Sequence, residues 1–598
     1  MRAPLITSLC ALCASASQID RHSLVARYNP TRNASSSTTP IQVGNGNFAF
    51  GADITGLQTL QPWAIMSTWG WKNDSFPTGM SLEDVLDYTG VSLDNHGRLV
   101  EYMFNGAQPM QQWMISNPNR VNLGAVGLVF RSQSGEVLNV TEADLTAVEQ
   151  ELDLWTGTLT SKFQFQGVSA QTVDNVGVTI SSPLLKSGQL GLFVDFPWND
   201  GSLKFSDPFV GTWNNASIHT TTLNTTTRGS ITAEIAHTLV NSTFVTSLGG
   251  DAFTITRDSP TAHRYTIHPT NKESSVFALS TAWGLTPPAS VLSPAEISSS
   301  SAEVWEEYWM GSGFVDVFTG SSDPRADELQ RRIILSRYLM RVNEAGDFPP
   351  QERAQVQQGW PTGARWGKMS DPSGQSSPLL IWQQPHPLVF ANYEYRANPT
   401  LSTLKKWEAV VRNTADWMAT FAWFNTTTGF YDLGPPLYVV AEDNNYNNTY
   451  NPAFELAYWR LGLGIAEEWM QRLGEPSSTG LDDGLDLQTS KLTTEKVWGA
   501  WNISNVWGWD FPLLAMSAAR IGEQEQAIEW LLHPLFQFDD AGMPVGGVRV
   551  PTPYFPGSGG LLYAIAMMAE GWDGSNGTAP GFPAEGWNVR AEGMSKAM

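Results

Sequence analysis

The sequence predicts a chain in two parts, an all-β sandwich followed by an α-helical domain. Up to about residue 300, short runs alternate apolar and polar residues, and Gly, Asn and Pro separate them, as in "VGLVFRS", "GLFVDFPW" and "TFVTSLGG". This pattern is typical of a β-sandwich. From "SSDPRADELQRRIILSRYLMRVNEAG" onward, apolar residues recur at three- and four-residue spacing, which indicates amphipathic helices.

The first 17 residues, "MRAPLITSLCALCASAS", have the layout of a secretory signal peptide. Arg2 precedes a short apolar run, and the run ends in small residues. The run is too short to span a membrane. Both cysteines of the chain, Cys10 and Cys13, lie in this segment, so we expect no disulfide in the mature protein. We therefore expect an extracellular protein with no membrane anchor.

Residues 18–298 form the predicted sandwich domain. The stretch "HTTTLNTTTRGSITAEI", 219–235, is strand and turn material, and "GNGNFAFG" is interpreted as a turn within the sandwich because no nucleotide-binding β-α pattern follows it. Residues 299–322 form a predicted linker helix, in "SPAEISSSSAEVWEEYWMGSG".

Residues 323–598 form the predicted helical domain. After its first helix, further helices are expected at about 377–397, 402–424, 451–473, 510–521, 523–534 and 558–570. This gives about seven helices after residue 320.

Composition and charge exclude some functions. A formal net charge of −23 would repel polyanions, so no nucleic-acid partner is expected. No His, Asp or Glu cluster has metal-ligand spacing, and we expect neither a metal nor another cofactor. The 25 tryptophans suit both a large core and the stacking of sugar rings. Ten N-glycosylation sequons support export, at Asn33, Asn73, Asn139, Asn215, Asn224, Asn241, Asn425, Asn447, Asn502 and Asn576.

Five longer motifs carry a family resemblance: "VGNGNFAFGADITGLQTL", "LLIWQQPHPLVFANYEYRANPT", "YDLGPPLYVVAEDN", "NPAFELAYWRLGL" and "YFPGSGGLLYAIAMMAEGW". Over most of its length the chain resembles six-hairpin glycosidase-like proteins related to glycoside hydrolase family 65. The resemblance implies a β-sandwich followed by an (α/α)6 toroid whose mouth holds the active site. It also implies a carbohydrate substrate and catalysis by two carboxyl groups.

Three carboxyl groups are the candidate catalytic residues. The resemblance places the general acid at Glu442, in the loop before the helix of "NPAFELAYW"; the simpler interpretation is a carboxylate that caps a helix or braces the loop. Glu455 lies on that helix, on a face with Tyr458 and Trp459, and is interpreted as a second carboxyl, either a substrate or supporting hydrogen-bond acceptor or the base. Asp510 is either the N-cap of the following helix or the base.

Amide, aromatic and basic side chains of the shared motifs are the candidate substrate-binding residues. They are Arg365, Trp366 and Lys368 of "ARWGKM", Trp382, Gln383 and Gln384 of "IWQQPHP", and Trp509. His386, between two prolines, is a further candidate for the pocket lining, and such a histidine is more often structural than a metal ligand.

Two departures from the family pattern affect the functional prediction. The C-terminal motif has Gly559 and Gly560 where the family has the Glu that acts as base, so a base would come from Asp510 or Glu455 or be absent. The chain also runs directly from Glu352 to Arg365, where relatives have an aromatic-rich helix pair. With seven helices against the twelve of a closed toroid, the helical domain is expected to be incomplete.

These observations favour a secreted glycoside hydrolase that cleaves oligo- or polysaccharides by a two-carboxylate, inverting mechanism. One alternative is a glycoside phosphorylase, which needs a phosphate site in place of a base. The other is a non-catalytic carbohydrate-binding protein on a decayed glycosidase scaffold.

Overall fold

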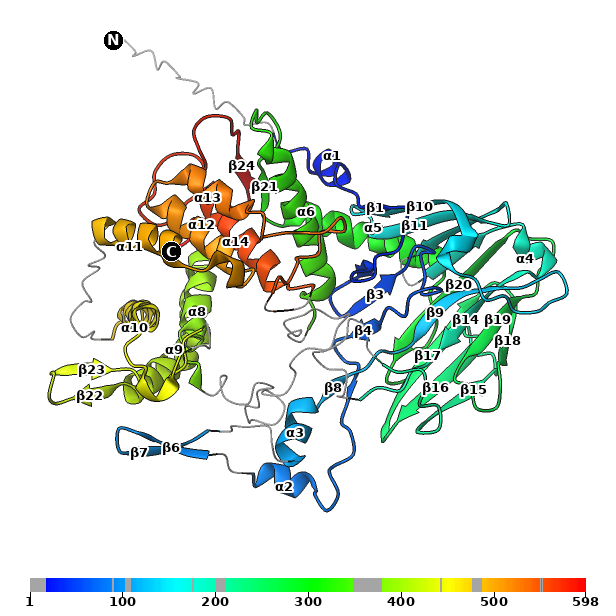
Figure 1. Ribbon diagram of the computed structural model, residues 1–598, viewed down its shortest axis with the longest axis horizontal. Coiled ribbons are helices and arrows are strands. Elements are labelled where there is room, and N and C mark those ends of the chain that lie inside the picture. The colour runs from blue at the N-terminus through cyan, green and yellow to red at the C-terminus, as the bar shows by residue number, and fades with distance from the viewer. Residues whose placement is uncertain are drawn as a thin grey trace, which may run out of the picture.

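The computed structural model describes residues 18–88, 91–102, 109–174, 177–200, 211–347, 379–440, 444–475, 487–548, 550 and 552–598. Strands dominate the chain up to residue 284, and helices dominate after residue 294. In Figure 1 the two large sheets lie on one side, the later helices lie on the other, and α5 and α6 lie between them. The change from strands to helices near residue 300 is therefore confirmed.

Two antiparallel sheets contain most of the strands. The larger sheet has the order β1 (Thr31–Arg32), β10 (Leu145–Asp153), β11 (Thr158–Phe165), β12 (Val168–Asp174), β13 (Gly177–Ser181), β20 (Val276–Gly284), β17 (Ser242–Gly250), β16 (Ala233–Leu239) and β15 (His219–Asn224). The smaller sheet has the order β18 (Phe253–Arg257), β19 (Tyr265–Pro269), β14 (Leu190–Asp195) and β9 (Ala125–Phe130).

The two sheets share one hydrophobic core. Along β16, buried residues alternate with partly exposed ones, so one face of this strand points into the core. Phe130 of β9, in the smaller sheet, contacts Phe165 of β11, in the larger sheet, with ring centroids 4.6 Å apart. The alternation that predicted strands thus has a direct physical cause, which is the burial of every second side chain between the sheets.

A small three-stranded sheet connects the strand-rich part to the helices. It consists of β2 (Ile41–Gly44), β3 (Phe48–Ala52) and β4 (Ile65–Ser67), and the turn predicted at "GNGNFAFG" joins β2 to β3. Gly46 in this turn has a φ of 92°, and a Cβ atom there would come within 2.5 Å of the backbone of Ala345. Glycine is therefore required both by the turn and by the close approach of the two parts.

The remaining short elements of the first part lie in its connections. They are α1 (Arg21–Ala26), α2 (Leu82–Leu86), α3 (Pro109–Ser116), α4 (Leu184–Ser187), the paired strands β5 (Trp71–Lys72) and β8 (Asn119–Arg120), and the hairpin of β6 (Val91–Asn95) and β7 (Arg98–Tyr102).

The predicted linker helix is α5 (Pro294–Gly311), which starts earlier than expected. Ser293 and Glu296 form a capping box, and Pro294 occupies the first turn, where its missing N–H costs no helical hydrogen bond. The helix packs on β13 and β20, and the indole N–H of Trp309 donates to the carbonyl of Leu154 at 2.9 Å. α5 is therefore part of the packed first half rather than a free connection.

The later helices are α6 (Arg325–Asn343), α8 (His386–Ala397), α9 (Leu401–Phe421), α10 (Ala453–Arg472), α11 (Leu487–Ala500), α12 (Asp510–Arg520), α13 (Gln524–Leu531) and α14 (Pro556–Glu570). The short strands in this part are β21 (Phe314–Asp316), which pairs with β24 (Arg590–Glu592), and β22 (Trp423–Asn425), which pairs with β23 (Phe430–Asp432). The described residues after 320 thus contain eight α-helices, against about seven expected.

Two sequence-based boundaries are wrong and one helix was not predicted. The helix expected at 377–397 begins only at His386, because Pro385 disfavours helical backbone at the residue before it. The helix expected at 402–424 ends at Phe421, and residues 423–425 form β22 instead. α11 was not expected, and its Val497 and Trp498 pack at the edge of the core formed by α12–α14.

The helices form two packed groups. α12, α13 and α14 share a core with α6, while α8, α9 and α10 share a second core. The groups are linked through α8, where the hydroxyl of Tyr393 bonds that of Tyr563 on α14 at 2.6 Å. Among the described residues, we find no helix long and apolar enough to cross a membrane.

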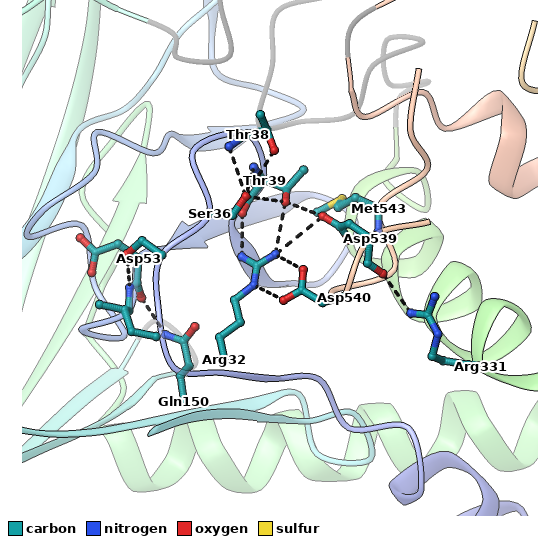
Figure 2. Close-up of polar contacts among 12 residues, drawn as sticks. Arg32, Ser36, Thr38, Thr39, Asp53, Gln150, Arg331, Asp539, Asp540 and Met543 are labelled. Atoms are coloured by element: carbon teal, nitrogen blue, oxygen red, sulfur yellow. Dashed lines mark hydrogen bonds and ion pairs between the residues drawn. The ribbon is translucent and has the colours of Figure 1, made fainter. Parts of the chain in front are cut away.

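An ion pair between a buried arginine and an exposed aspartate joins the strand-rich part to the helical part (Figure 2). The guanidinium of Arg32, 9% exposed, donates to Asp540 at 2.7 and 2.8 Å and to the carbonyl of Thr39 at 2.7 Å. Thr39 in turn donates to Asp539, whose carbonyl accepts from Arg331 of α6. This network ties the first strand of the large sheet to the loop before α14 through groups about 500 residues apart.

Candidate functional site

The starts of α8 and α10 lie together in the second helical group. His386, the first residue of α8, shares a 2.5 Å hydrogen bond with the hydroxyl of Tyr458, in the second turn of α10. Gly462 allows this contact, because a Cβ atom there would come within 2.9 Å of Pro385. The packing therefore brings the "IWQQPHP" and "NPAFELAYW" motifs into one place, although about 70 residues separate them.

Glu455 is a buried carboxyl group without a hydrogen-bond partner among the described residues. It lies in the first turn of α10, its side chain is fully buried, and neither Oε1 nor Oε2 accepts a hydrogen bond. Burial raises the pKa of Glu455 from 4.5 to about 7.

Two opposing effects act on the charge of Glu455. The positive end of the α10 dipole favours the carboxylate by at most about 1 kcal/mol at such a position. The rise in pKa to about 7 corresponds to about 3 kcal/mol against the carboxylate. Desolvation therefore dominates, and at neutral pH the group exchanges readily between its protonated and ionised forms.

Other polar groups with no partner in the described part of the chain belong to the same two motifs. The indole N–H groups of Trp382 and Trp459 are buried and have no acceptor. The Oε1 atom of Gln383 is also buried and has no donor. The Nε2 atom of Gln383 donates to the carbonyl of Leu380 at 3.1 Å, which fixes the amide. Gln384 is partly buried beside them.

Unsatisfied buried donors and acceptors are rare in native proteins and each calls for an explanation. An indole N–H donates, an amide oxygen accepts, and a carboxyl group can do either. A hydroxyl-rich ligand such as a sugar offers partners to all three kinds of group. Glu455 and Trp459 lie on one helix, and the bond between His386 and Tyr458 joins that helix to the motif that contains Trp382 and Gln383.

Asp510 lies in the first helical group, at the first residue of α12. Trp509 occupies the N-cap position, so the N-cap interpretation of Asp510 is wrong. The Oδ2 atom of Asp510 instead accepts the backbone N–H of Trp507 at 2.7 Å and so braces the turn that leads into the helix. This bond uses one carboxylate oxygen of a buried side chain.

Gly559 and Gly560 of α14 differ in how much space a side chain would have at each position. A Cβ atom on Gly560 would come within 3.1 Å of Pro512, so this glycine allows α14 to pack closely against α12. A Cβ atom on Gly559 would meet nothing nearer than 4.0 Å. No carboxylate occupies these positions, as the sequence showed.

Four of the predicted site residues lie outside the described residues. They are the acid candidate Glu442 and the binding candidates Arg365, Trp366 and Lys368. The stretch from Glu352 to Arg365 lies outside them too. Of the remaining candidates, the structure places Trp382, Gln383, Gln384 and Glu455 in the second helical group, and Trp509 and Asp510 in the first.

Sequence reasoning missed two features of this part. His386 was named as a pocket-lining candidate or a structural residue, but its hydrogen bond to a tyrosine one turn from Glu455 was not anticipated. Glu344, at the end of α6, was not considered, although burial raises its pKa to about 8. A His flanked by prolines before a helix is a weak signal, and nothing in the sequence around Glu344 indicated burial. No group of three metal-ligating side chains occurs in the described ranges.

No protein-family model matches the sequence, and no curated protein shows significant similarity to it. Among solved structures, the chain is similar to one assigned as a kojibiose phosphorylase from the human microbiome, with a TM-score of 0.53 and 8% identity, covering 91% of this chain and 89% of the other. A bacterial glucoamylase in complex with acarbose aligns over 90% of this chain and 95% of its own, at 9% identity and a TM-score of 0.42, which is too low to carry an argument.

The first of these matches shows a shared fold over nearly the whole of both chains. At 8% identity this match shows the fold alone, and that fold agrees with the one expected from the resemblance.

Proposed function

We propose that this protein is a secreted glycoside hydrolase that cleaves an oligo- or polysaccharide by a two-carboxylate, inverting mechanism. Its site would lie in a toroid-like helical domain behind an N-terminal β-sandwich. Support comes from the fold shared with a protein assigned as a glycoside phosphorylase and from the signal-peptide pattern of residues 1–17. The observation that carries the proposal is the buried carboxyl of Glu455, which has no hydrogen-bond partner among the described residues and lies on the same helix as the unpartnered indole N–H of Trp459.

The pKa of about 7 suits Glu455 to donate a proton below neutral pH. In the proposed reaction, the bond between the anomeric carbon and the glycosidic oxygen breaks as this oxygen takes the proton of the acid. A water molecule adds to the anomeric carbon from the opposite face and gives up one proton to a second, ionised carboxylate. Glu442 or Asp510 would be this second group.

The resemblance assigns the role of proton donor to Glu442 instead of Glu455. The two assignments can be distinguished by how the activity of each variant depends on the leaving group of the substrate. An aryl leaving group such as dinitrophenolate departs without a proton. If Glu455 is the donor, Glu455→Gln should lose activity toward glucosyl oligosaccharides such as kojibiose, yet keep turnover of a dinitrophenyl glucoside. A variant that lacks the base should lose both activities.

The experiment compares Glu455→Gln, Glu442→Gln and Asp510→Asn on a panel of glucosyl oligosaccharides and on dinitrophenyl glucoside. Products are followed by chromatography, and sugar binding is followed by calorimetry. Wild-type turnover of oligosaccharides by Glu455→Gln would refute its role. Binding of sugars by the wild type without any products would support the non-catalytic alternative.

A phosphorylase is the second candidate, because the shared fold is that of a protein assigned as one. In that reaction inorganic phosphate attacks the anomeric carbon, and no general base is needed. The glycines at positions 559 and 560 fit this possibility. Measuring turnover with and without added phosphate distinguishes the two, since a phosphorylase forms a sugar phosphate and is inactive toward cleavage without phosphate.

A further inference from the structure

The β22–β23 hairpin places a sequon asparagine beside an exposed aromatic ring. Asn425 ends β22 and lies directly opposite Phe430, the first residue of β23. Directly opposed residues of an antiparallel pair project from the same face, with Cβ atoms about 5 Å apart. Asn425 starts the sequon Asn425-Thr426-Thr427.

Phe430 is unusually open to solvent for an apolar residue in a strand. Its side chain is 73% exposed, and it contacts no aromatic ring in the described part of the chain. On the other face of the hairpin, Phe424 and Tyr431 cover each other, with ring centroids 5.1 Å apart. The rings of Phe424 and Tyr431 thus have each other as neighbours although both are exposed, while the ring of Phe430 has no such neighbour among the described residues.

The amide of Asn425 is held in one orientation. Its Oδ1 atom accepts the backbone N–H groups of Thr427 and Thr428, at 3.0 and 3.3 Å. Its Nδ2 atom donates one hydrogen to Asp432 at 2.9 Å. The second hydrogen of Nδ2 has no acceptor among the described residues, and this is the hydrogen that N-glycosylation replaces.

We propose that Asn425 carries an N-linked glycan whose first sugar ring packs on Phe430. A lipid pyrophosphate-linked oligosaccharide would be the donor: a bond forms between Nδ2 and the anomeric carbon, the bond from that carbon to the lipid pyrophosphate breaks, and Nδ2 loses one proton. The C–H face of the sugar would cover the ring, and the hydrogen bond to Asp432 remains. The inference rests on the export proposed above but not on hydrolysis.

The chain offers a matched pair of variants to test this site. Thr427→Ala destroys the sequon, while Thr426→Ala changes the neighbouring exposed threonine and keeps it. The full chain with its own leader is produced in a secreting eukaryotic host, and each sequon is mapped by mass spectrometry of its peptides. We expect a glycan on Asn425 in the wild type and in Thr426→Ala, and none in Thr427→Ala.

Chymotrypsin, which cleaves after Phe and Tyr, tests the packing on the ring. We expect cleavage after Phe430 to be several-fold faster in Thr427→Ala than in Thr426→Ala. The glycosylated Thr426→Ala should melt at a higher temperature than Thr427→Ala. When Phe430→Ser is added to both variants, their melting temperatures should no longer differ, because the ring that the sugar covers is absent.

The possible results separate this inference from the proposed export. Glycans at other sequons with Asn425 bare would overturn the inference and leave export intact. No glycan at any sequon would overturn both. Equal cleavage rates in Thr426→Ala and Thr427→Ala, with Asn425 glycosylated in the former, would show that the sugar does not cover Phe430.

Discussion

Replacing Glu455 with Gln should stabilise the protein at neutral pH. Glutamine has nearly the shape of glutamate and no charge, so it removes the cost of ionising a fully buried group that has no hydrogen-bond partner in the described part of the chain. The pKa of Glu455 is about 7 in the fold against an ordinary value of 4.5. At 1.36 kcal/mol per pKa unit, this difference corresponds to about 3 kcal/mol of unfolding free energy.

The sign follows from proton linkage. A group whose folded pKa is raised is protonated in both states below pH 4.5, so its contribution to stability is then fully present. Between pH 4.5 and pH 7, Glu455 is ionised in the unfolded chain but still mostly protonated in the folded protein. Its contribution to stability is therefore lost as the pH rises to about 7. The stability advantage of Glu455→Gln should therefore be near zero at pH 4.5 and grow to about 3 kcal/mol above pH 7.

Thermal unfolding of the wild type and the variant at pH 4.5, 6, 7 and 8 measures this difference. The melting temperature of Glu455→Gln should exceed that of the wild type by several degrees at pH 8 and by little at pH 4.5. Glu468→Gln is a matched control on the same helix, since its side chain is 60% exposed and should change stability by less than about 1 kcal/mol. A gain that does not depend on pH, or no gain at pH 8, would refute the argument.

Three further predictions concern other parts of the chain. Burial beside two other histidines lowers the pKa of His219 from 6.5 to about 4, so His219 is neutral in the folded protein above pH 4. The free energy of unfolding should therefore fall by up to about 3 kcal/mol as the pH drops from 6.5 to 4. Denaturant titrations of His219→Gln should show a weaker dependence on pH. Arg32→Ala should cost about 1–3 kcal/mol in calorimetric unfolding, because the buried guanidinium donates to the carbonyl of Thr39 and to Asp540. Asp540→Asn should cost less, because that side chain is 56% exposed. Gly560→Glu should lower the free energy of unfolding by about 1–3 kcal/mol, because its Cβ atom would lie within 3.1 Å of Pro512, while Gly559→Glu should be tolerated. Equal losses in thermal unfolding would contradict the packing argument.

The broad division of the chain could be predicted because burial imposes a period on the sequence. Strands such as β16 alternate buried and partly exposed residues, and most later helices lie where three- and four-residue spacing indicated. The errors have local causes. α11 has the sequence "LQTSKLTTEKVWGA", whose three threonines weaken the helical signal. The β22–β23 hairpin was missed because its aromatic residues continue the apolar pattern of α9.

The site could be predicted only as a set of motifs. The residue types of "IWQQPHP" and "NPAFELAYW" pointed to a sugar site, but their contact through His386 and Tyr458 depends on how α8 packs on α10. The pKa of Glu455 depends in the same way on what surrounds it, since no neighbouring residue in the sequence reveals complete burial. Contacts such as Arg32 with Asp540 join residues 508 positions apart and leave no local signal.

The cost of keeping a carboxyl at position 455 bears on the function of the site. A glutamine there would relieve a penalty of about 3 kcal/mol at neutral pH, a large fraction of the 5–15 kcal/mol that stabilises a typical domain. Local features that oppose stability are expected where a protein uses them. Beside Glu455 the unsatisfied groups are indole N–H and amide groups, which bind neutral hydroxyls and do not neutralise a charge. Among the described residues no side chain donates to the carboxyl of Glu455, so no salt bridge within that part of the chain offsets its burial. The proton transfer proposed for Glu455 would account for a carboxyl that the fold keeps at this cost.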